Sequence, residues 1–303
     1  MSTANARFLW LRWWPTWLAL WLLRMIARWP YARQLSFGAA LGDFARSLPL
    51  PQQRVVRRNL ALCLPEKSLT ERAELLRQHF REAGITVAET ALVWFASDAR
   101  IRELVQFEGL EELDRVTATG RGAILLAAHF TTLEIGARCA TATRRVHAVY
   151  KPSKNALVTE FFEKYRGAHA AGMIASDDIR KMVRVLRAGG IVWYAPDQAF
   201  RGKGALMVPF FGIDAASNPA TSRLAALTGA AVLPYFVERL PGTAGYRVRI
   251  AAPLENFPSE DPQADTLRIH HLIEAEVRRN PAQYLWLHKR FKGLDRNYPE
   301  HYA

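Results

Sequence analysis

A histidine and a glutamate with four residues between them have the clearest chemical potential in this sequence. An apolar run, Ile124–Ala128, ends at His129, and Glu134 lies in a segment that predicts a helix beginning at the Thr131-Thr132 pair. A carboxylate can hold one imidazole nitrogen as a donor, so that the other nitrogen acts as a base. Because no serine or cysteine lies beside His129, the hydroxyl to be deprotonated is predicted to belong to a substrate.

The same residues also fit a purely structural interpretation. Thr131 as N-cap and Glu134 at the third helical position would form a capping box, in which each satisfies a backbone N–H group. Under this alternative, His129 is only a polar residue that closes a strand.

The elements that must position these residues follow from the hydrophobic pattern. Before residue 106 the sequence predicts helices at about 33–47, 53–62 and from Ser68 or Thr70 to Phe95. Beyond it, apolar runs that predict strands (122–128, 146–150, 191–196, 231–237, 246–252) alternate with helical stretches (155–167, 176–187, 217–229). This alternation indicates an α/β fold with a central, mostly parallel sheet flanked by helices.

The domain organisation predicted for the 303 residues is simple. Residues 1–30 form an anchor segment, and residues 31–303 form a single domain. That domain comprises amino-terminal helices over 31–105, the α/β core over 106–255, and a final helix (about 264–279) with a tail over 256–303.

A second carboxylate is predicted to lie near the histidine. Asp197 closes the run that begins at Ile191, and the carboxyl ends of parallel strands meet at one edge of a sheet. We therefore expect Asp197 beside His129, among the residues that contact the substrate. A surface turn is the alternative, since proline, aspartate and glycine are turn formers.

Basic residues follow the same strand ends. Lys151, Lys154 and Arg166 lie after the 146–150 run, and Arg201 and Lys203 follow Asp197. Such residues are often only solvated, but here they are predicted to border the crevice where ligands of α/β sheets bind. An arginine fork suits a phosphate better than a lysine does.

The charge and cysteine content restrict the partners and cofactors. The formal charge is +13, and residues 1–60 carry nine arginines, no lysine and one acidic residue, Asp43. A basic surface attracts anionic lipid headgroups or acidic proteins, whereas no nucleic-acid-binding motif accompanies the charge. Cys63 and Cys139 are isolated, and no glycine-rich nucleotide motif occurs. We therefore predict a protein that needs no metal or cofactor.

The amino-terminal segment predicts contact with a membrane. Residues 8–24 contain five of the nine tryptophans. The uncharged stretch Trp13–Leu23 is too short to cross a hydrocarbon core of about 30 Å, and tryptophan with arginine is typical of the headgroup region. An amphipathic anchor over residues 1–30 is predicted, with one tilted span as the alternative. Arg24, Arg28 and Arg33 after the apolar stretch place the following domain on the cytoplasmic side.

Together these features resemble the late acyltransferases of lipid A biosynthesis, the lauroyl and myristoyl transferases of the glycerolipid acyltransferase superfamily. The resemblance covers nearly the whole chain. It rests on the tryptophan-rich amino terminus and on a series of motifs: Arg58-Asn59-Leu60, Ala128-His129-Phe130 with Glu134, Val149-Tyr150-Lys151-Pro152, Arg166, Pro196-Asp197-Gln198, Val208-Pro209-Phe210-Phe211-Gly212, Ala231-Val232-Leu233-Pro234, Pro281, Gln283-Tyr284-Leu285-Trp286 and His288-Lys289-Arg290-Phe291.

The resemblance implies a specific reaction. His129 and Glu134 would be the catalytic dyad, Arg166 a substrate contact, an acyl-carrier-protein thioester the donor, and a hydroxyl of a lipid A precursor the acceptor. From the position of the basic residues we further predict that the acceptor's phosphates contact Lys151, Lys154, Arg201 and Lys203, although the family pattern has arginine where this chain has Lys151. The expected location is the cytoplasmic face of the inner membrane.

Three alternatives remain at the level of sequence. The acceptor could be another membrane lipid, such as a lysophospholipid or a glycosylated phosphatidylinositol. Water in place of the acceptor would make the protein a thioesterase. If the residues around Glu134 are only a helix cap, the chain would be a non-catalytic membrane-binding protein.

Overall fold

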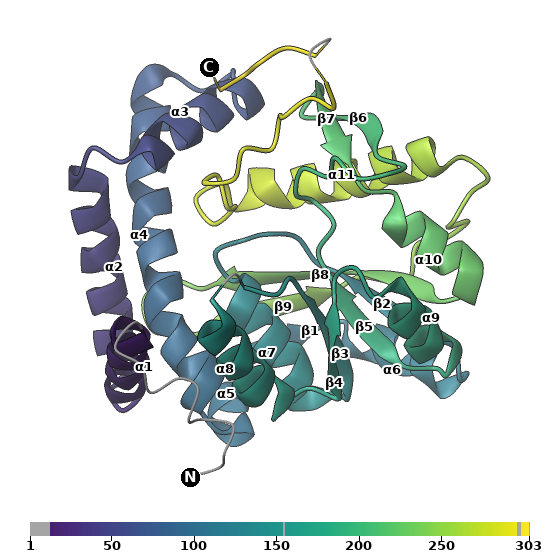
Figure 1. The fold of residues 1–303 in the computed structure, drawn as a ribbon, viewed down its shortest axis with the longest axis horizontal. Coiled ribbons are helices and arrows are strands. Elements are labelled where there is room, and N and C mark those ends of the chain that lie inside the picture. Colours follow the sequence, from purple (N-terminus) through teal and green to yellow (C-terminus); the bar gives the residue numbers. More distant parts are fainter. Residues whose placement is uncertain (1–12, 154, 296–297, 303) are drawn as a thin grey trace.

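A seven-stranded sheet forms the centre of the molecule (Figure 1). The protein, seen here as a computed structural model, is described over residues 13–153, 155–295 and 298–302. The strands are β1 (Val105–Glu108), β2 (Ala123–Leu126), β3 (Val146–Tyr150), β4 (Gly172–Ala175), β5 (Ile191–Tyr194), β8 (Ala231–Arg239) and β9 (Tyr246–Ile250). A separate hairpin consists of β6 (Leu206–Phe210) and β7 (Ile213–Ser217).

The strand order is β1-β9-β8-β2-β5-β3-β4. The five strands from β8 to β4 are mutually parallel. Strand β9 pairs antiparallel with β8 and parallel with β1. All four residues of the central strand β2 are buried, as expected for a parallel strand covered on both faces. The carboxyl ends of β2, β3, β4 and β5 therefore open at the same edge of the sheet.

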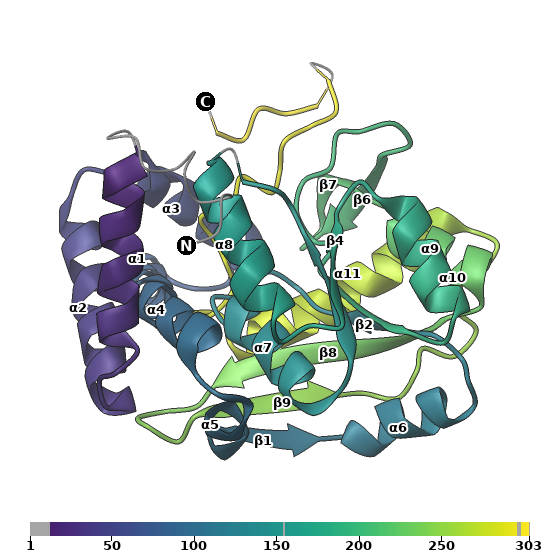
Figure 2. The ribbon, with the colours of Figure 1, turned by 60° about the horizontal axis from the view of Figure 1, so that its bottom comes forward.

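Helices cover both faces of this sheet (Figures 1 and 2). Ile124 and Leu126 of β2 pack in the same core as residues of α9, α10 and α11, whereas Ala123 and Leu125 face α6 and α7. The helices are α1 (Trp14–Ile26), α2 (Tyr31–Ser47), α3 (Pro51–Cys63), α4 (Leu69–Phe95), α5 (Asp98–Glu103), α6 (Leu110–Ala118), α7 (Leu133–Thr143), α8 (Ala156–Gly167), α9 (Ile179–Arg187), α10 (Ala220–Thr228) and α11 (Pro262–Arg279).

Helices α2 and α4 lie in backbone contact beside the sheet (Figure 1). A Cβ atom on Gly42 would lie 2.0 Å from the carbonyl oxygen of Phe80, and one on Gly84 would lie 2.2 Å from that of Gly38. Only glycine at these positions allows the two helices to approach so closely. This packing fixes the position of α4. A side chain of this helix, Thr86, is hydrogen-bonded to the turn that follows His129.

The sequence predicted the main elements correctly. The predicted strands correspond to β2, β3, β5, β8 and β9, and α4 begins with the capping box of Ser68 and Glu71. It did not predict β1, β4 or the β6–β7 hairpin.

The amino-terminal segment forms a helix over part of its predicted length. Residues 1–12 of the predicted anchor lie outside the described residues, and α1 covers 13 residues from Trp14. Among the helices that the structure describes, none has both the length and the apolar character required to cross a bilayer. Figure 2 shows α1 in front of α2 on one side of the molecule.

Candidate active site

His129 lies in the turn between β2 and α7, as predicted. Its backbone is held on both sides: its N–H donates to the carboxylate of Asp197 at 3.0 Å, and its carbonyl accepts from the N–H of Leu285 at 2.9 Å. Phe130 forms an isolated antiparallel bridge with Tyr284. The position of the imidazole is therefore fixed by backbone hydrogen bonds from two distant segments.

Asp197 follows β5, which is hydrogen-bonded to β2, and it lies beside His129 as the strand order predicts. Its Oδ1 is 2.7 Å from Nδ1 of His129, and its Oδ2 accepts the hydroxyl of Tyr284 at 3.1 Å. The Asp197 side chain is 1% exposed, whereas that of His129 is 20% exposed. The carboxylate is thus buried behind a histidine that reaches solvent.

This arrangement determines the chemistry of the imidazole. Burial alone would raise the pKa of Asp197, but the charge and hydrogen bonds of His129 outweigh burial and lower it to about 2. An ionised carboxylate only accepts hydrogen bonds, so Nδ1 of His129 carries the proton. Nε2, which has no hydrogen-bond partner among the described residues, is the nitrogen that can accept a proton from another molecule.

The predicted contact between Glu134 and the imidazole is corrected by the structure, because Asp197 takes that place. Helix α7 begins one residue before Glu134, and the Glu134 carboxylate forms an ion pair with Arg166. The capping-box alternative is also wrong. The N-cap is Thr132 without a side-chain cap, and its hydroxyl donates to the carbonyl of Val237 at 2.6 Å.

The ion pair joins the ends of two helices. Glu134 lies in the first turn of α7 and Arg166 in the last turn of α8. An acid at a helix amino terminus and a base at a carboxyl terminus are both favoured by the helix dipole. The two side chains are only 25% and 18% exposed, so the guanidinium is held in a defined place.

A cavity of about 400 Å³ brings four of the eight predicted site residues together. Its wall contains His129, Glu134, Arg166 and Lys151, together with residues that follow β4 and β5. The cavity lies at the carboxyl edge of the parallel strands, where ligands of open α/β sheets bind. Its volume is within the range of small-molecule sites.

The remaining basic residues predicted for the site are placed differently. Arg201 and Lys203 are exposed in the segment before β6 and do not line this cavity. Arg201 donates to the carbonyl of Leu294 at 3.2 Å. Lys154 lies outside the described residues. Of the four residues predicted to contact phosphate, Lys151 is therefore the one that lines this cavity among the described residues.

The structure also shows contacts of residues for which no role was predicted. Gln283 accepts the N–H of Thr131 with its backbone carbonyl at 2.7 Å, and its side-chain amide pairs with the backbone of Arg239. The Thr86 hydroxyl of α4 donates to the carbonyl of Thr131 at 2.6 Å. The motif containing Gln283 was visible in the sequence, but its contacts join segments too distant for any local pattern to reveal.

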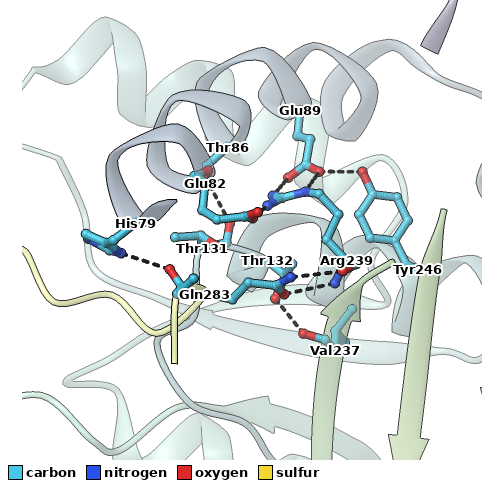
Figure 3. A network of polar contacts seen from close by, with 11 residues as sticks. His79, Glu82, Thr86, Glu89, Thr131, Thr132, Val237, Arg239, Tyr246 and Gln283 are labelled. Atoms are coloured by element: carbon cyan, nitrogen blue, oxygen red, sulfur yellow. Dashed lines mark hydrogen bonds and ion pairs between the residues drawn. The ribbon is translucent and has the colours of Figure 1, made fainter. Parts of the chain in front are cut away.

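Figure 3 shows that these contacts belong to one buried polar network. At its centre, the Arg239 guanidinium pairs with Glu89 at 2.6 Å and also with Glu82, both on α4. Glu89 accepts the Tyr246 hydroxyl at 2.5 Å. The network therefore ties α4, β8 and β9 to the turn that follows His129.

Comparisons with known proteins identify the family of this chain. Residues 1–293 match the model of the bacterial lipid A biosynthesis acyltransferase family. The chain is 35% identical to the lipid A biosynthesis palmitoleoyltransferase of Escherichia coli (strain K12), over 95% of this chain and 94% of the relative. It is 32% identical to the lauroyltransferase (96% and 95%) and 26% identical to the myristoyltransferase (93% and 88%) of the same strain. The chain therefore belongs to the bacterial lipid A biosynthesis acyltransferase family and is an acyltransferase of lipid A biosynthesis.

Proposed function

We propose that this protein transfers a fatty acyl chain from an acyl-carrier-protein thioester to a hydroxyl of a lipid A precursor, with His129 as general base. The observation that supports this most directly is the 2.7 Å contact between Nδ1 of His129 and Asp197. It leaves Nε2 as the basic nitrogen of a histidine that lines the 400 Å³ cavity.

The reaction needs one proton acceptor and one site for negative charge. Nε2 of His129 takes the proton of the acceptor hydroxyl while the hydroxyl oxygen bonds to the thioester carbonyl carbon. The carbon–sulfur bond then breaks, and the departing thiolate takes the proton from the imidazolium. The products are an ester and the free thiol of the carrier protein. Buried Asp197 stabilises the imidazolium that forms in between.

Arg166 is the residue that we propose to stabilise the oxyanion. Two of the backbone N–H groups near the start of α7 are already engaged, since Thr131 donates to Gln283 and Leu133 donates to Phe130. Arg166 lines the cavity with His129, and its ion pair with Glu134 fixes the guanidinium in advance. Preorganised donors of this kind are usually a large part of catalysis. In this proposal Glu134 supports the reaction through Arg166.

A reconstituted reaction tests the proposed function. Purified protein, an acyl-carrier-protein thioester and a lipid A precursor in detergent micelles should yield a product heavier by one acyl group, detected by mass spectrometry. Parallel reactions with a lysophospholipid, and with no acceptor, measure the two alternative activities. Faster release of free fatty acid than of acylated lipid would contradict the proposal and indicate a thioesterase.

We further propose that α1 rests on the cytoplasmic face of the inner membrane. Leu20 and Ile26 of α1 are buried, whereas Trp14, Leu18, Trp21 and Leu22 are 46–63% exposed. Spacing of this kind places the exposed residues along one face of the helix. An apolar stripe rich in tryptophan is typical of helices that lie at the headgroup boundary.

Charge added to this stripe should release the protein from lipid. The double substitution Leu18→Lys with Trp21→Lys should lower partitioning onto vesicles of anionic phospholipid at least tenfold, since each large apolar side chain contributes about 1.5–3 kcal/mol when buried. Vesicle flotation measures the partition. Leu227→Lys is the matched control, because Leu227 of α10 is 54% exposed and lies outside the stripe. Equal flotation of all three proteins would show that the membrane contact lies elsewhere.

A further inference from the structure

Two motifs on which the family resemblance rests have no role in the reaction described above, and the structure brings them together. Asn59 of α3 donates to the carbonyl oxygens of Trp286 and His288 at 2.7 and 2.9 Å. Its Oδ1 accepts the hydroxyl of Tyr302 at 2.6 Å. The Arg58-Asn59-Leu60 segment and the segment from His288 to Phe291 are therefore held side by side.

A second cavity, of about 550 Å³, opens beside this junction. Its wall is formed by α3, by Lys289 and by the segment 300–302. Three cations, Arg54, Arg58 and Lys289, line it, and Glu300 is the one acidic residue among its described lining residues. The carboxylate of Glu300 already accepts the N–H of Tyr302 at 3.0 Å.

The three cations are not neutralised by other described residues. Arg58 donates through Nε to the carbonyl of His301 at 2.9 Å, and the Lys289 ammonium lies 5.5 Å from the centre of the Tyr302 ring. Neither these two residues nor Arg54 has a described carboxylate within 4.0 Å, whereas many other arginines of the chain are paired.

The placement of the two arginines is unfavourable without a ligand. Arg54 and Arg58 are four residues apart on α3, so they share one helix face, where like charges repel. An anion bound between the two guanidinium groups would attract both and outweigh their mutual repulsion. A concave site with two guanidinium groups suits a phosphate, since arginine forms bidentate, charge-assisted hydrogen bonds with it.

We propose that this cavity binds a phosphate group of the acyl acceptor, so that Arg54, Arg58 and Lys289 select a phosphorylated glycolipid. The identification of the acceptor rests on the proposed function, whereas the phosphate site itself does not. Among the described residues, Lys151 is the one predicted phosphate contact that lines the cavity at His129, since Arg201 and Lys203 do not line it. The second cavity adds two arginines and a lysine as further phosphate contacts.

The second cavity is close enough to His129 to serve the same acceptor. Leu285 is hydrogen-bonded to the carbonyl of His129, and four residues of extended chain span at most about 14 Å to Lys289. A small cavity lined by His129, Asn59 and His288 lies in the same region. A phosphorylated sugar whose acyl chain reaches Nε2 can bridge this distance.

The test compares two acceptors and two kinds of variant. The acceptors are a phosphorylated lipid A precursor and the same lipid after enzymatic removal of its phosphates, in identical micelles. The variants are Arg54→Gln and Arg58→Gln, with Arg57→Gln as the matched control. Arg57 is exposed on the same helix, contacts Gln53 and does not line the cavity.

Each cavity variant should raise KM for the phosphorylated acceptor about tenfold, the loss typical of one charge-assisted hydrogen bond. The kcat value and the KM for the carrier-protein donor should stay near those of the wild type. With the dephosphorylated acceptor, wild type and variants should share one KM. Equal effects on both acceptors, or an equal effect of Arg57→Gln, would overturn the proposal. A rise in the donor KM alone would assign the cavity to the carrier protein instead.

Binding measured without turnover separates this proposal from the proposed function. Titration calorimetry with the phosphorylated acceptor and no donor should show the same tenfold loss in the cavity variants, even if the wild type transfers no acyl chain. Inorganic phosphate should compete with the acceptor for the wild type. Stronger competition from phosphatidylglycerol micelles than from the acceptor would identify a phospholipid headgroup site and overturn the assignment to the acceptor.

Discussion

Replacement of His129 by alanine should lower kcat for acyl transfer by about 10²–10⁴-fold, the range typical of losing a general base. No second imidazole lines the 400 Å³ cavity among the described residues. Nearby His288 already accepts the N–H of Ala199 with its Nε2 at 3.1 Å, so we expect it not to replace Nε2 of His129. The rate of ester formation from a carrier-protein thioester measures the loss. His271→Ala is the control, because His271 is exposed on α11, away from this cavity, and should retain wild-type turnover.

Two carboxylate variants distinguish the interpretations of the site. Asp197→Asn should lower kcat strongly, because an amide in contact with Nδ1 no longer stabilises the imidazolium. Glu134→Gln should act through Arg166, so Arg166→Ala combined with Glu134→Gln should be no worse than Arg166→Ala alone. Full activity of Asp197→Asn together with an inactive Glu134→Gln would restore Glu134 as the partner of His129.

The largest effect on stability is expected at Arg239. Arg239→Met removes the guanidinium from between Glu82 and Glu89 and leaves the Glu89 carboxylate, which is 2% exposed, without its cation. Breaking a buried pair in this way costs about 3–5 kcal/mol of unfolding free energy. Denaturant unfolding followed by circular dichroism measures this change.

An exposed ion pair provides the comparison. Arg100 and Glu103 are 2.8 Å apart and 46% and 63% exposed, so Arg100→Met should cost less than about 1 kcal/mol. Adding Glu89→Gln to Arg239→Met should recover part of the loss, because the uncompensated charge is then removed. Similar costs for the Arg239 and Arg100 variants would show that the network in Figure 3 contributes little to stability.

Contacts that follow from the order of the parallel strands could be predicted from the sequence. Contacts that depend on how distant segments pack could not. His129 and Asp197 meet because parallel strands end at one edge, and this could be predicted from two apolar runs. The partner of Glu134 could not be predicted, because it depends on where α8 ends relative to α7. The spacing between His129 and Glu134 suggested a contact, but a turn precedes the helix and directs the carboxylate towards Arg166.

The contacts of the carboxyl-terminal segment show the same limit. Nothing local in the sequence indicates that Gln283 pairs with Arg239, or that Asn59 holds the backbone at Trp286 and His288. Such pairings depend on the packed positions of α3, α4 and β8. These pairings determine how the turn at His129 is held and how the wall of the second cavity is formed.

The hydrogen bonds that residues 283–285 make around His129 also have a consequence for biosynthesis. A domain generally folds as a unit, so a chain that ends within it lacks contacts of the folded state. When α11 is complete, every described residue that lines the cavity at His129 has been made, but the partners of the Thr131 N–H and of the His129 carbonyl have not. A nascent chain at that stage, or one cut short by a stop codon after Arg279, would contain the base and its carboxylate but lack the hydrogen bonds from residues 283–285 that hold the turn. We therefore expect acyl transfer only from a chain whose translation has continued past Leu285.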